Sequence, residues 1–428
     1  MEEAIEAQPT QRDLVKRFKY LIGLPDEIDA DEYAGKAITI MEKCARSLLI
    51  TRRGYHQSRR DYQFEDYTWK NSLGRAILIF VGLRITIIAI VPADNQLVTV
   101  FLGNPFHGKS YSQEVALLTL LLLTVLSILR EVAIYIEDAG YIMDLQFLRI
   151  IQIYGFDHKL LFLTPKQCKA MKPVLIFHVV NWTRMLRFNK FANGVIMLSF
   201  RLFDPLFYSN PVYFITSVFW IVMETFAARM SFTALLNVGG HTIVMVPWYI
   251  FRLRSVHEMV VKVNSMDRIS ESRLKHLTRS LLFYLNCYDK IMKDCRYLFF
   301  YCIFFVSFLA DTVIFMAIVS SYPSHIIGTF YFAGFFCITA IGSVIYFAGE
   351  FVDRPNIIHG LLTKIIHKCQ AGYEEKLNMH KVLDRIAIYG TGIRIGDVIN
   401  KIERDLFVFY ILENASTVML LICNIRTA

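Results

Sequence analysis

Residues 211–252 read PVYFITSVFWIVMETFAARMSFTALLNVGGHTIVMVPWYIFR, and this stretch decides the fold. It stays apolar for about 40 residues, roughly twice the length that one helix needs to cross a bilayer. We expect one long helix that leaves the membrane and packs in the cytosol, with bends at Gly239, Gly240 and Pro247. Two separate crossings are the alternative, in which case the preceding stretch of residues 173–206 does not cross.

The composition is that of a membrane protein. Hydrophobic residues make up 55% of the 428 residues, charged residues make up 19%, and the mean hydropathy is +0.41. The net charge of +9 is expected on the cytosolic side, where anionic lipid attracts it. We therefore expect contact with the lipid bilayer of the cell membrane and no nucleic-acid partner.

Lysine and arginine are divided unequally among the loops. Roughly 37 of the 46 Lys and Arg residues lie in segments that share the N-terminal side of the membrane. The N-terminus is therefore expected in the cytosol and, after about seven crossings, the C-terminus outside the cell. The predicted fold is all-α: a seven-transmembrane helical protein with cytosolic helix extensions.

The chain divides into two expected parts. Residues 1–75 form a cytosolic segment with an amphipathic helix, whose apolar face carries Ile38, Met41, Ala45, Leu48 and Leu49. Residues 76–425 form the transmembrane domain, including anchor helices at about 252–296 and 350–404.

Two expected spans carry charges. Arg84 lies inside the first span and should face protein or water rather than lipid. The third span, residues 173–206, is interrupted by Arg184, Arg187 and Lys190. It is therefore either a crossing buried by its neighbours or a membrane-associated cytosolic helix.

A narrow apolar seam precedes the fifth span. Its members are spaced four, three, four, three, four: Leu277, Leu281, Tyr284, Tyr288, Ile291 and Cys295. Such a seam usually packs against another helix. We predict that Leu277, Leu281, Tyr288 and Ile291 lie at a subunit contact or in the cytosolic core beneath it.

The sequence motifs give little indication of an enzyme. The chain has no CxxC and no HExxH, and no Ser/His/Asp arrangement can be proposed from spacing. Residues 390–396, GTGIRIG, have one residue too many for a dinucleotide loop and are predicted to form a turn between helices. We expect no catalytic residue, metal site or cofactor.

The end of the chain carries a family resemblance. Residues 417–425, TVMLLICNI, resemble the C-terminal signature of insect gustatory receptors, TYhhhhhQF, where h is any hydrophobic residue. The Thr and the hydrophobic run match, whereas Val418, Asn424 and Ile425 replace the Tyr, Gln and Phe. The Asn286-Cys-Tyr288 sequence before the fifth span and the basic helix after the sixth add to the likeness, which covers roughly residues 277–425.

This resemblance to the insect chemoreceptor superfamily implies a ligand-gated cation channel that acts as a gustatory receptor for a small molecule. It implies a homo- or hetero-tetramer with related subunits, in which the final helix of each lines the pore for permeant cations. Thr417, Leu421 and Asn424 share one face of that helix and are the pore-lining candidates. The ligand would lie among the outer halves of spans two to six, where the chain offers Tyr213, Trp220, Glu224, Asp311, Tyr331 and Phe335.

Two other functions stay open from the sequence. A seven-helix metabotropic receptor has the opposite topology to the one that the charge pattern predicts. A membrane transporter should show polar or Gly/Pro-broken spans in matched halves, and the sequence shows no convincing repeat.

Overall fold

The computed structural model describes residues 19, 23–24, 30–47, 54–55, 68–91, 95–107, 112–138, 145–319, 324–389, 392–399 and 401–426. Within these residues the chain is helical, and its only extended pairing is an isolated bridge between Ile395 and Ile399. The predicted all-α class is confirmed for this part of the chain. The helices are α2 Ala30–Ser47, α3 Thr68–Ile90, α4 Gln96–Leu102, α5 Ser112–Asp138, α6 Gln146–Tyr154, α7 Pro165–Leu202, α8 Leu206–Ser209, α9 Pro211–Asn264, α10 Glu271–Tyr301, η2 Cys302–Val306, α11 Ser307–Val319, α12 Ser324–Ala348, α13 Glu350–Lys368, α14 Tyr373–Tyr389 and α15 Asp405–Arg426.

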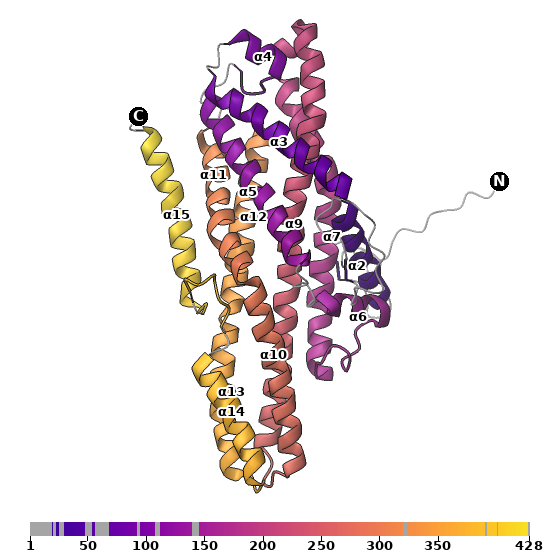
Figure 1. Cartoon of the computed structure of the whole chain (residues 1–428), viewed down its shortest axis with the longest axis vertical. Helices are drawn as coiled ribbons and strands as arrows, with labels where there is room; N and C mark the ends of the chain where they lie inside the picture. Colours follow the sequence, from indigo (N-terminus) through magenta and orange to yellow (C-terminus); the bar gives the residue numbers. More distant parts are fainter. Residues whose placement is uncertain are drawn as a thin grey trace, which may run out of the picture.

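Helix α9 forms the long axis of the molecule (Figure 1). Its 54 residues correspond to a length of about 80 Å. The side chain of Asn210 caps its start by accepting hydrogen bonds from the backbone N–H groups of Val212 and Tyr213, at 3.0 and 3.1 Å. Pro211 at the first position suits a helix start because its fixed φ is helical. The prediction of one long helix is confirmed.

The glycines in α9 serve packing. The helix continues unbroken through Gly239, Gly240 and Pro247. The indole N–H of Trp182 donates to the backbone carbonyl of Leu236, and a Cβ atom on Gly240 would strike that indole ring. The absent side chain at Gly240 therefore lets α7 approach α9 closely.

Helix α7 lies antiparallel against α9. At its start, the amide of Gln167 donates to Glu258 at 2.6 Å. At its end, Arg201 pairs with Glu224 at 2.9 Å. The residues of α9 that it meets thus run backwards along the chain. Of the three charges that interrupt α7, Arg184 and Lys190 are half-buried and Arg187 is exposed.

Six helical segments in the described part of the chain are long and apolar enough to cross a membrane. They are Trp69–Ile90, Ser112–Glu137, Pro211–Asn264, Cys295–Val319, Ile327–Lys368 and Asp405–Cys423. Helix α7 is not among them, so the seventh crossing and the sidedness of the termini stay predictions.

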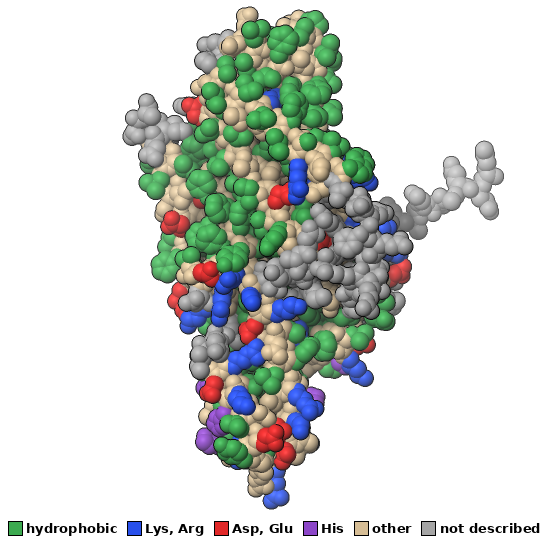
Figure 2. All heavy atoms as spheres, in the orientation of Figure 1, with side chains coloured by type: hydrophobic (Ala, Val, Ile, Leu, Met, Phe, Trp, Pro, Cys, Tyr) green, Lys and Arg blue, Asp and Glu red, His purple; other side chains and the backbone are tan. Residues whose placement is uncertain are grey.

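The end of the molecule opposite α4 is a helical bundle, here called the extension bundle. It is formed by the C-terminal part of α9 with α10, α13 and α14 (Figure 1). Lys, Arg, Asp, Glu and His side chains gather over this end, whereas hydrophobic side chains cover much of the rest of the visible face (Figure 2). Ion pairs join its helices: Arg254 to Glu350 and Arg385 to Asp289, each at 2.5 Å.

An arginine surrounded by aromatic rings marks the beginning of this bundle. Arg252 of α9 is 4% exposed, and its guanidinium carbon lies 4.9 Å from the ring centre of Trp248. The rings of Phe162 and Phe283 lie 5.5 and 5.4 Å from it. Cation–π attraction therefore helps to hold this buried charge where α9, α10 and the loop before α7 meet.

Helix α2 is the predicted amphipathic helix. Ile38, Met41 and Ala45 are at most 1% exposed, while Leu48 and Leu49 lie outside the described residues. Its buried face packs on α6 and α7, and Thr183 of α7 donates to the backbone carbonyl of Ala37 at 3.2 Å. The amphipathic pattern thus fits a helix that covers the bundle.

Candidate ligand site and pore helix

A buried ionic cluster lies near the α4 end of the molecule. Arg84 of α3 donates to the Glu224 carboxylate on α9, and Arg201 of α7 approaches the same carboxylate at 2.9 and 3.1 Å. Arg84, Arg201 and Glu224 are 2%, 0% and 8% exposed. The expectation that Arg84 faces protein is confirmed. One carboxylate joins three helices here, and two arginines against one glutamate leave the cluster with an excess positive charge.

Backbone carbonyl groups in the turn after α4 stabilise this excess positive charge. Arg84 donates to the backbone carbonyls of Leu102 and Gly103 at 2.7 and 2.8 Å, and Arg201 donates to Gly103 at 3.2 Å. Gly103 has φ +54°, and a Cβ atom there would lie 3.2 Å from the backbone of Ser217. The turn therefore needs a glycine, both for its left-handed backbone and for its close approach to α9.

Three predicted ligand residues belong to this cluster. Tyr213, Trp220 and Glu224 all lie on α9 and are 0%, 5% and 8% exposed. The Tyr213 hydroxyl donates to the Asp204 carboxylate at 2.8 Å and lies 3.0 Å from the Asn104 carbonyl, while Arg84 lies 4.5 Å from the ring centre of Trp220. The Tyr213 hydroxyl and the Glu224 carboxylate already have partners within the chain, and a ligand would have to displace these partners to reach them.

The other three predicted ligand residues lie elsewhere. Tyr331 and Phe335 stack on α12 with ring centres 6.4 Å apart, and Phe335 is 58% exposed. Asp311 of α11 is 3% exposed. It lies on the side of α11 that meets α15, because Ser307, one turn earlier, bonds to Tyr410 of that helix at 2.9 Å. The six predicted ligand residues therefore do not form one site. Three lie in the buried cluster on α9, two lie together on α12, and Asp311 lies on α11.

Among the described residues, helix α15 packs against other helices along one side. It packs on α11 and α12, and in Figure 1 it stands at the edge of the molecule. Only 11% of its span is buried, against 61% of the span Cys295–Val319. Large apolar side chains on its outer surface are open: Val408, Phe409, Leu412, Met419 and Leu420 are 55–67% exposed.

Glu413 is an acidic residue on the open side of α15. Its side chain is exposed, and it stands eight residues after the start of the helix at Asp405, about 12 Å along the axis. Thr417 follows four residues later, so Glu413 lies within about 40° of the predicted pore face. The sequence analysis missed Glu413, although its spacing from Thr417 was a readable signal.

The predicted pore residues lie on the second half of α15. Thr417 and Leu421 are half-buried, and the side chain of Asn424 lies outside the described residues. Thr417 comes seven residues after Tyr410 and three after the buried Asn414, so Thr417 and Leu421 lie on the side of α15 that packs on α11, whereas Glu413 is exposed.

The seam on α10 packs within the chain. Leu277, Leu281 and Tyr288 are 2%, 2% and 1% exposed, and the side chain of Ile291 lies outside the described residues. Tyr288 packs against Tyr249 and Phe351, with ring centres 6.2 and 5.2 Å apart. Burial raises the pKa of Tyr288 well above its usual value, which keeps the phenol neutral. Of the two predicted places for this seam, the described side chains occupy the core rather than a free subunit surface.

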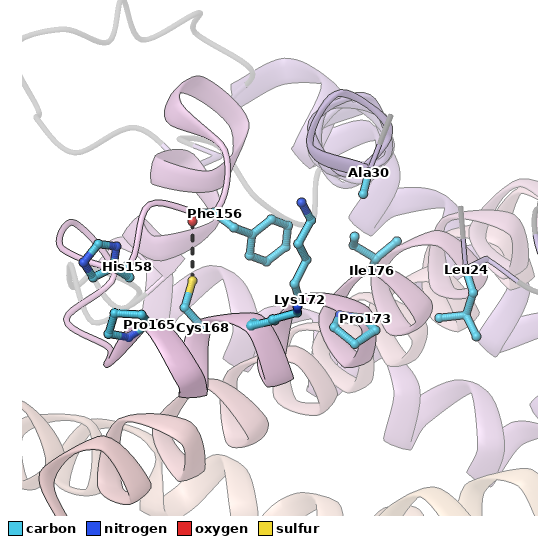
Figure 3. A pocket seen from close by; sticks show the side chains of 10 residues that line it. Leu24, Ala30, Phe156, His158, Pro165, Cys168, Lys172, Pro173 and Ile176 are labelled. Atoms are coloured by element: carbon cyan, nitrogen blue, oxygen red, sulfur yellow. Dashed lines mark hydrogen bonds between the residues drawn. The ribbon is translucent and has the colours of Figure 1, made fainter. Parts of the chain in front are cut away.

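A cavity of about 650 Å³ opens beside α2 and the start of α7 (Figure 3). Its walls are mostly apolar, with Phe156 and Pro173 among them, and Lys172 projects between them. Lys172 is paired with Asp31 at 2.8 Å. The residues that line the cavity include none of the predicted ligand residues. This cavity belongs to the packing between α2, α7 and the loop before α7.

No protein-family model and no curated protein matches this chain.

Proposed function

We propose that the chain is one subunit of a ligand-gated cation channel of the gustatory-receptor type, with α15 lining a pore at the centre of an assembly. The C-terminal resemblance to insect gustatory receptors in residues 417–425 supports this function. The proposed subunit crosses the membrane seven times, with α7 as the third crossing. Its extension bundle lies in the cytosol and its C-terminus lies outside. The gating ligand is a small molecule.

The position of Glu413 is the observation that carries the proposal. A charged side chain that faces lipid near the bilayer centre costs about 2.5–3.5 kcal/mol on insertion scales. Glu413 is exposed on a helix long and apolar enough to span a membrane. In an assembly that turns this side of α15 towards a shared axis, the carboxylate faces water instead of lipid. A ring of such carboxylates also attracts cations.

The sparse packing of α15 supports the same arrangement. The helix makes its contacts along α11 and α12, and its remaining surface is open. A polar face formed by Glu413 and Thr417 is flanked by apolar residues that suit contact with lipid or neighbouring subunits. Leu421 then forms an apolar ring that closes the pore by excluding water.

The third crossing is supported by the way α7 lies against α9. Arg201 is fully buried and paired with Glu224, and Arg184 bonds to Tyr33 at 3.2 Å, so these two charges are held by the protein, whereas Arg187 is exposed. A span of low hydropathy is tolerated where neighbouring helices satisfy its polar groups.

The proposal is tested by recording from cells that express Leu421→Ala. Opening the apolar ring is expected to raise the basal conductance above that of wild type without any added ligand. Asn424→Asp should increase cation entry by adding a negative ring. Surface labelling of each variant is the expression control. Wild-type behaviour of both variants, in a chain shown to conduct, would remove α15 from the pore, and a surface-expressed Leu421→Ala that passes no current would refute the channel function.

A further inference from the structure

Helix α7 carries positive charges and no negative one. Its 38 residues include seven Lys and Arg but no Asp or Glu. Three of the seven, Arg184, Arg187 and Lys190, follow one another at intervals of three residues, so the Cβ atoms of successive members lie about 5–6 Å apart. Arg184 donates to the Tyr33 hydroxyl at 3.2 Å. Arg187 and Lys190 form no ion pair within the described part of the chain, which leaves two neighbouring positive charges without an anion.

The position of Arg187 along the helix matches a membrane border. Arg84 of α3 and Arg201 of α7 both donate to the Gly103 carbonyl, at 2.8 and 3.2 Å, so they mark one level near the α4 end. Lys70 precedes Arg84, and Arg187 precedes Arg201, by about 14 residues, or about 21 Å. Helix α3 continues for about 9 Å beyond Arg84, which gives an apolar length of about 30 Å, the thickness of a hydrocarbon core. Lys70 and Arg187 therefore lie together at the cytosolic border in the proposed orientation.

An exposed apolar stripe continues from these cations towards the α4 end of α7. Its members are spaced four, three and four residues apart: Phe191, Val195, Leu198 and Leu202. Phe191 and Val195 are 75% and 66% exposed, and the other two are also exposed. The helical period places Arg187 on the same side, one turn before Phe191. This side of α7 therefore offers positive charge at the membrane border and apolar surface along the hydrocarbon.

We propose that this side of α7 binds an anionic phospholipid of the cytosolic leaflet, with the phosphate on Arg187 and Lys190 and an acyl chain along Phe191 and Val195. Anionic lipids are concentrated in the cytosolic leaflet, and they attract basic residues at its surface. Guanidinium and ammonium groups donate charge-assisted hydrogen bonds to phosphate oxygens. A second copy of α7 suits this side poorly, because it would bring its own cations and no carboxylate to the contact.

The bound lipid accounts for an exposed charge on a helix that is proposed to cross the membrane. A charged side chain that faces hydrocarbon is costly, and long basic side chains relieve this cost by reaching the headgroup region. The lipid phosphate provides Arg187 with a partner there that the described part of the chain does not provide. This inference rests on the proposed crossing by α7 and not on the conduction of ions.

The test is native mass spectrometry of the delipidated full-length protein in detergent, titrated with phosphatidylserine or with phosphatidylcholine of the same acyl chains. Wild type should bind phosphatidylserine at least about tenfold more tightly. Arg187→Gln combined with Lys190→Gln should abolish this preference, whereas Arg187→Lys should keep most of it because the charge remains. Lys166→Gln combined with Lys169→Gln removes two charges from exposed positions nearer the start of the same helix and should behave as wild type does. Size-exclusion chromatography of each variant checks folding.

Equal binding of the two lipids by wild type would overturn the site, as would an unchanged preference in the folded double variant of Arg187 and Lys190. Competition by inorganic phosphate at the lipid's own concentration would replace the lipid with a free anion. Loss of oligomer mass in that double variant, with lipid binding unchanged, would assign this side of α7 to another subunit. The titration needs no current, so its failure leaves the channel proposal standing. A protein that binds the lipid here but never conducts would keep the site and reject the channel.

Discussion

Several polar side chains are buried in this structure. Some of them have hydrogen-bond partners within the described residues, and others do not. Arg84, Arg201 and Glu224 pair with one another, and Arg84 also donates to the turn after α4. The hydroxyl of Tyr288 is also buried, but it has no hydrogen-bond partner among the described residues. A hydroxyl buried without a partner destabilises the folded state, and a bonded one stabilises it.

Two tyrosines provide a matched pair at this scale. Tyr288→Phe is expected to raise the free energy of unfolding by about 1 kcal/mol because it removes an unpaired buried hydroxyl. Tyr213→Phe should lower it by about 1 kcal/mol, since that hydroxyl bonds to Asn104 and Asp204. Thermal unfolding of the detergent-purified proteins measures both. Equal shifts in the same direction would show that hydrogen bonding does not distinguish the two sites.

At the scale of helices, the sequence was most informative about properties of a single helix, such as its length and its buried face. The length of the apolar run predicted that α9 is continuous, and periodicity predicted the buried faces of α2 and α10. Periodicity identifies an apolar face and not its partner. It therefore left open whether the seam of Leu277 and Leu281 meets another subunit or its own chain. The pairing of Arg84 with Glu224 was also unreadable, because 140 residues separate them.

The seam gives a prediction for the extension bundle. Leu281→Asp is expected to lower its stability by several kcal/mol, because an unpaired carboxylate would enter a core where Leu281 is 2% exposed. The loss should appear as a low yield of monodisperse protein in size-exclusion chromatography. His276→Asp changes an exposed position on the same helix and should behave as wild type. Normal yield and normal assembly of Leu281→Asp would contradict the packing of this seam.

For the whole molecule, the orientation in the membrane stays a prediction from the charge pattern. Charged side chains gather over the extension bundle, and α15 ends near the opposite half of the molecule (Figures 1 and 2). The sequence predicts this orientation because the distribution of Lys and Arg among the loops can be counted without knowing how the helices pack. The sequence could not predict the sparse packing of α15. A membrane helix has a similar apolar sequence whether it faces lipid, its own chain or a second subunit.

Epitope tags test the orientation in intact cells. A tag before Met1 should be reached by antibody only after permeabilisation, whereas a tag after Ala428 should be labelled without it. The expectation follows from the unequal division of Lys and Arg among the loops. Surface labelling of the N-terminal tag in intact cells would reverse the topology and with it the proposed channel.

The charge on Glu413 provides the most direct test of the pore. Reversal potentials are measured under a NaCl gradient in cells that express Leu421→Ala, either alone or combined with Glu413→Lys. With α15 lining the pore, Leu421→Ala should conduct cations in preference to anions because a ring of carboxylates attracts them. Adding Glu413→Lys reverses the ring's charge and should shift the reversal potential towards that of chloride. An unchanged reversal potential in the double variant, with both proteins at the surface and conducting, would contradict the account.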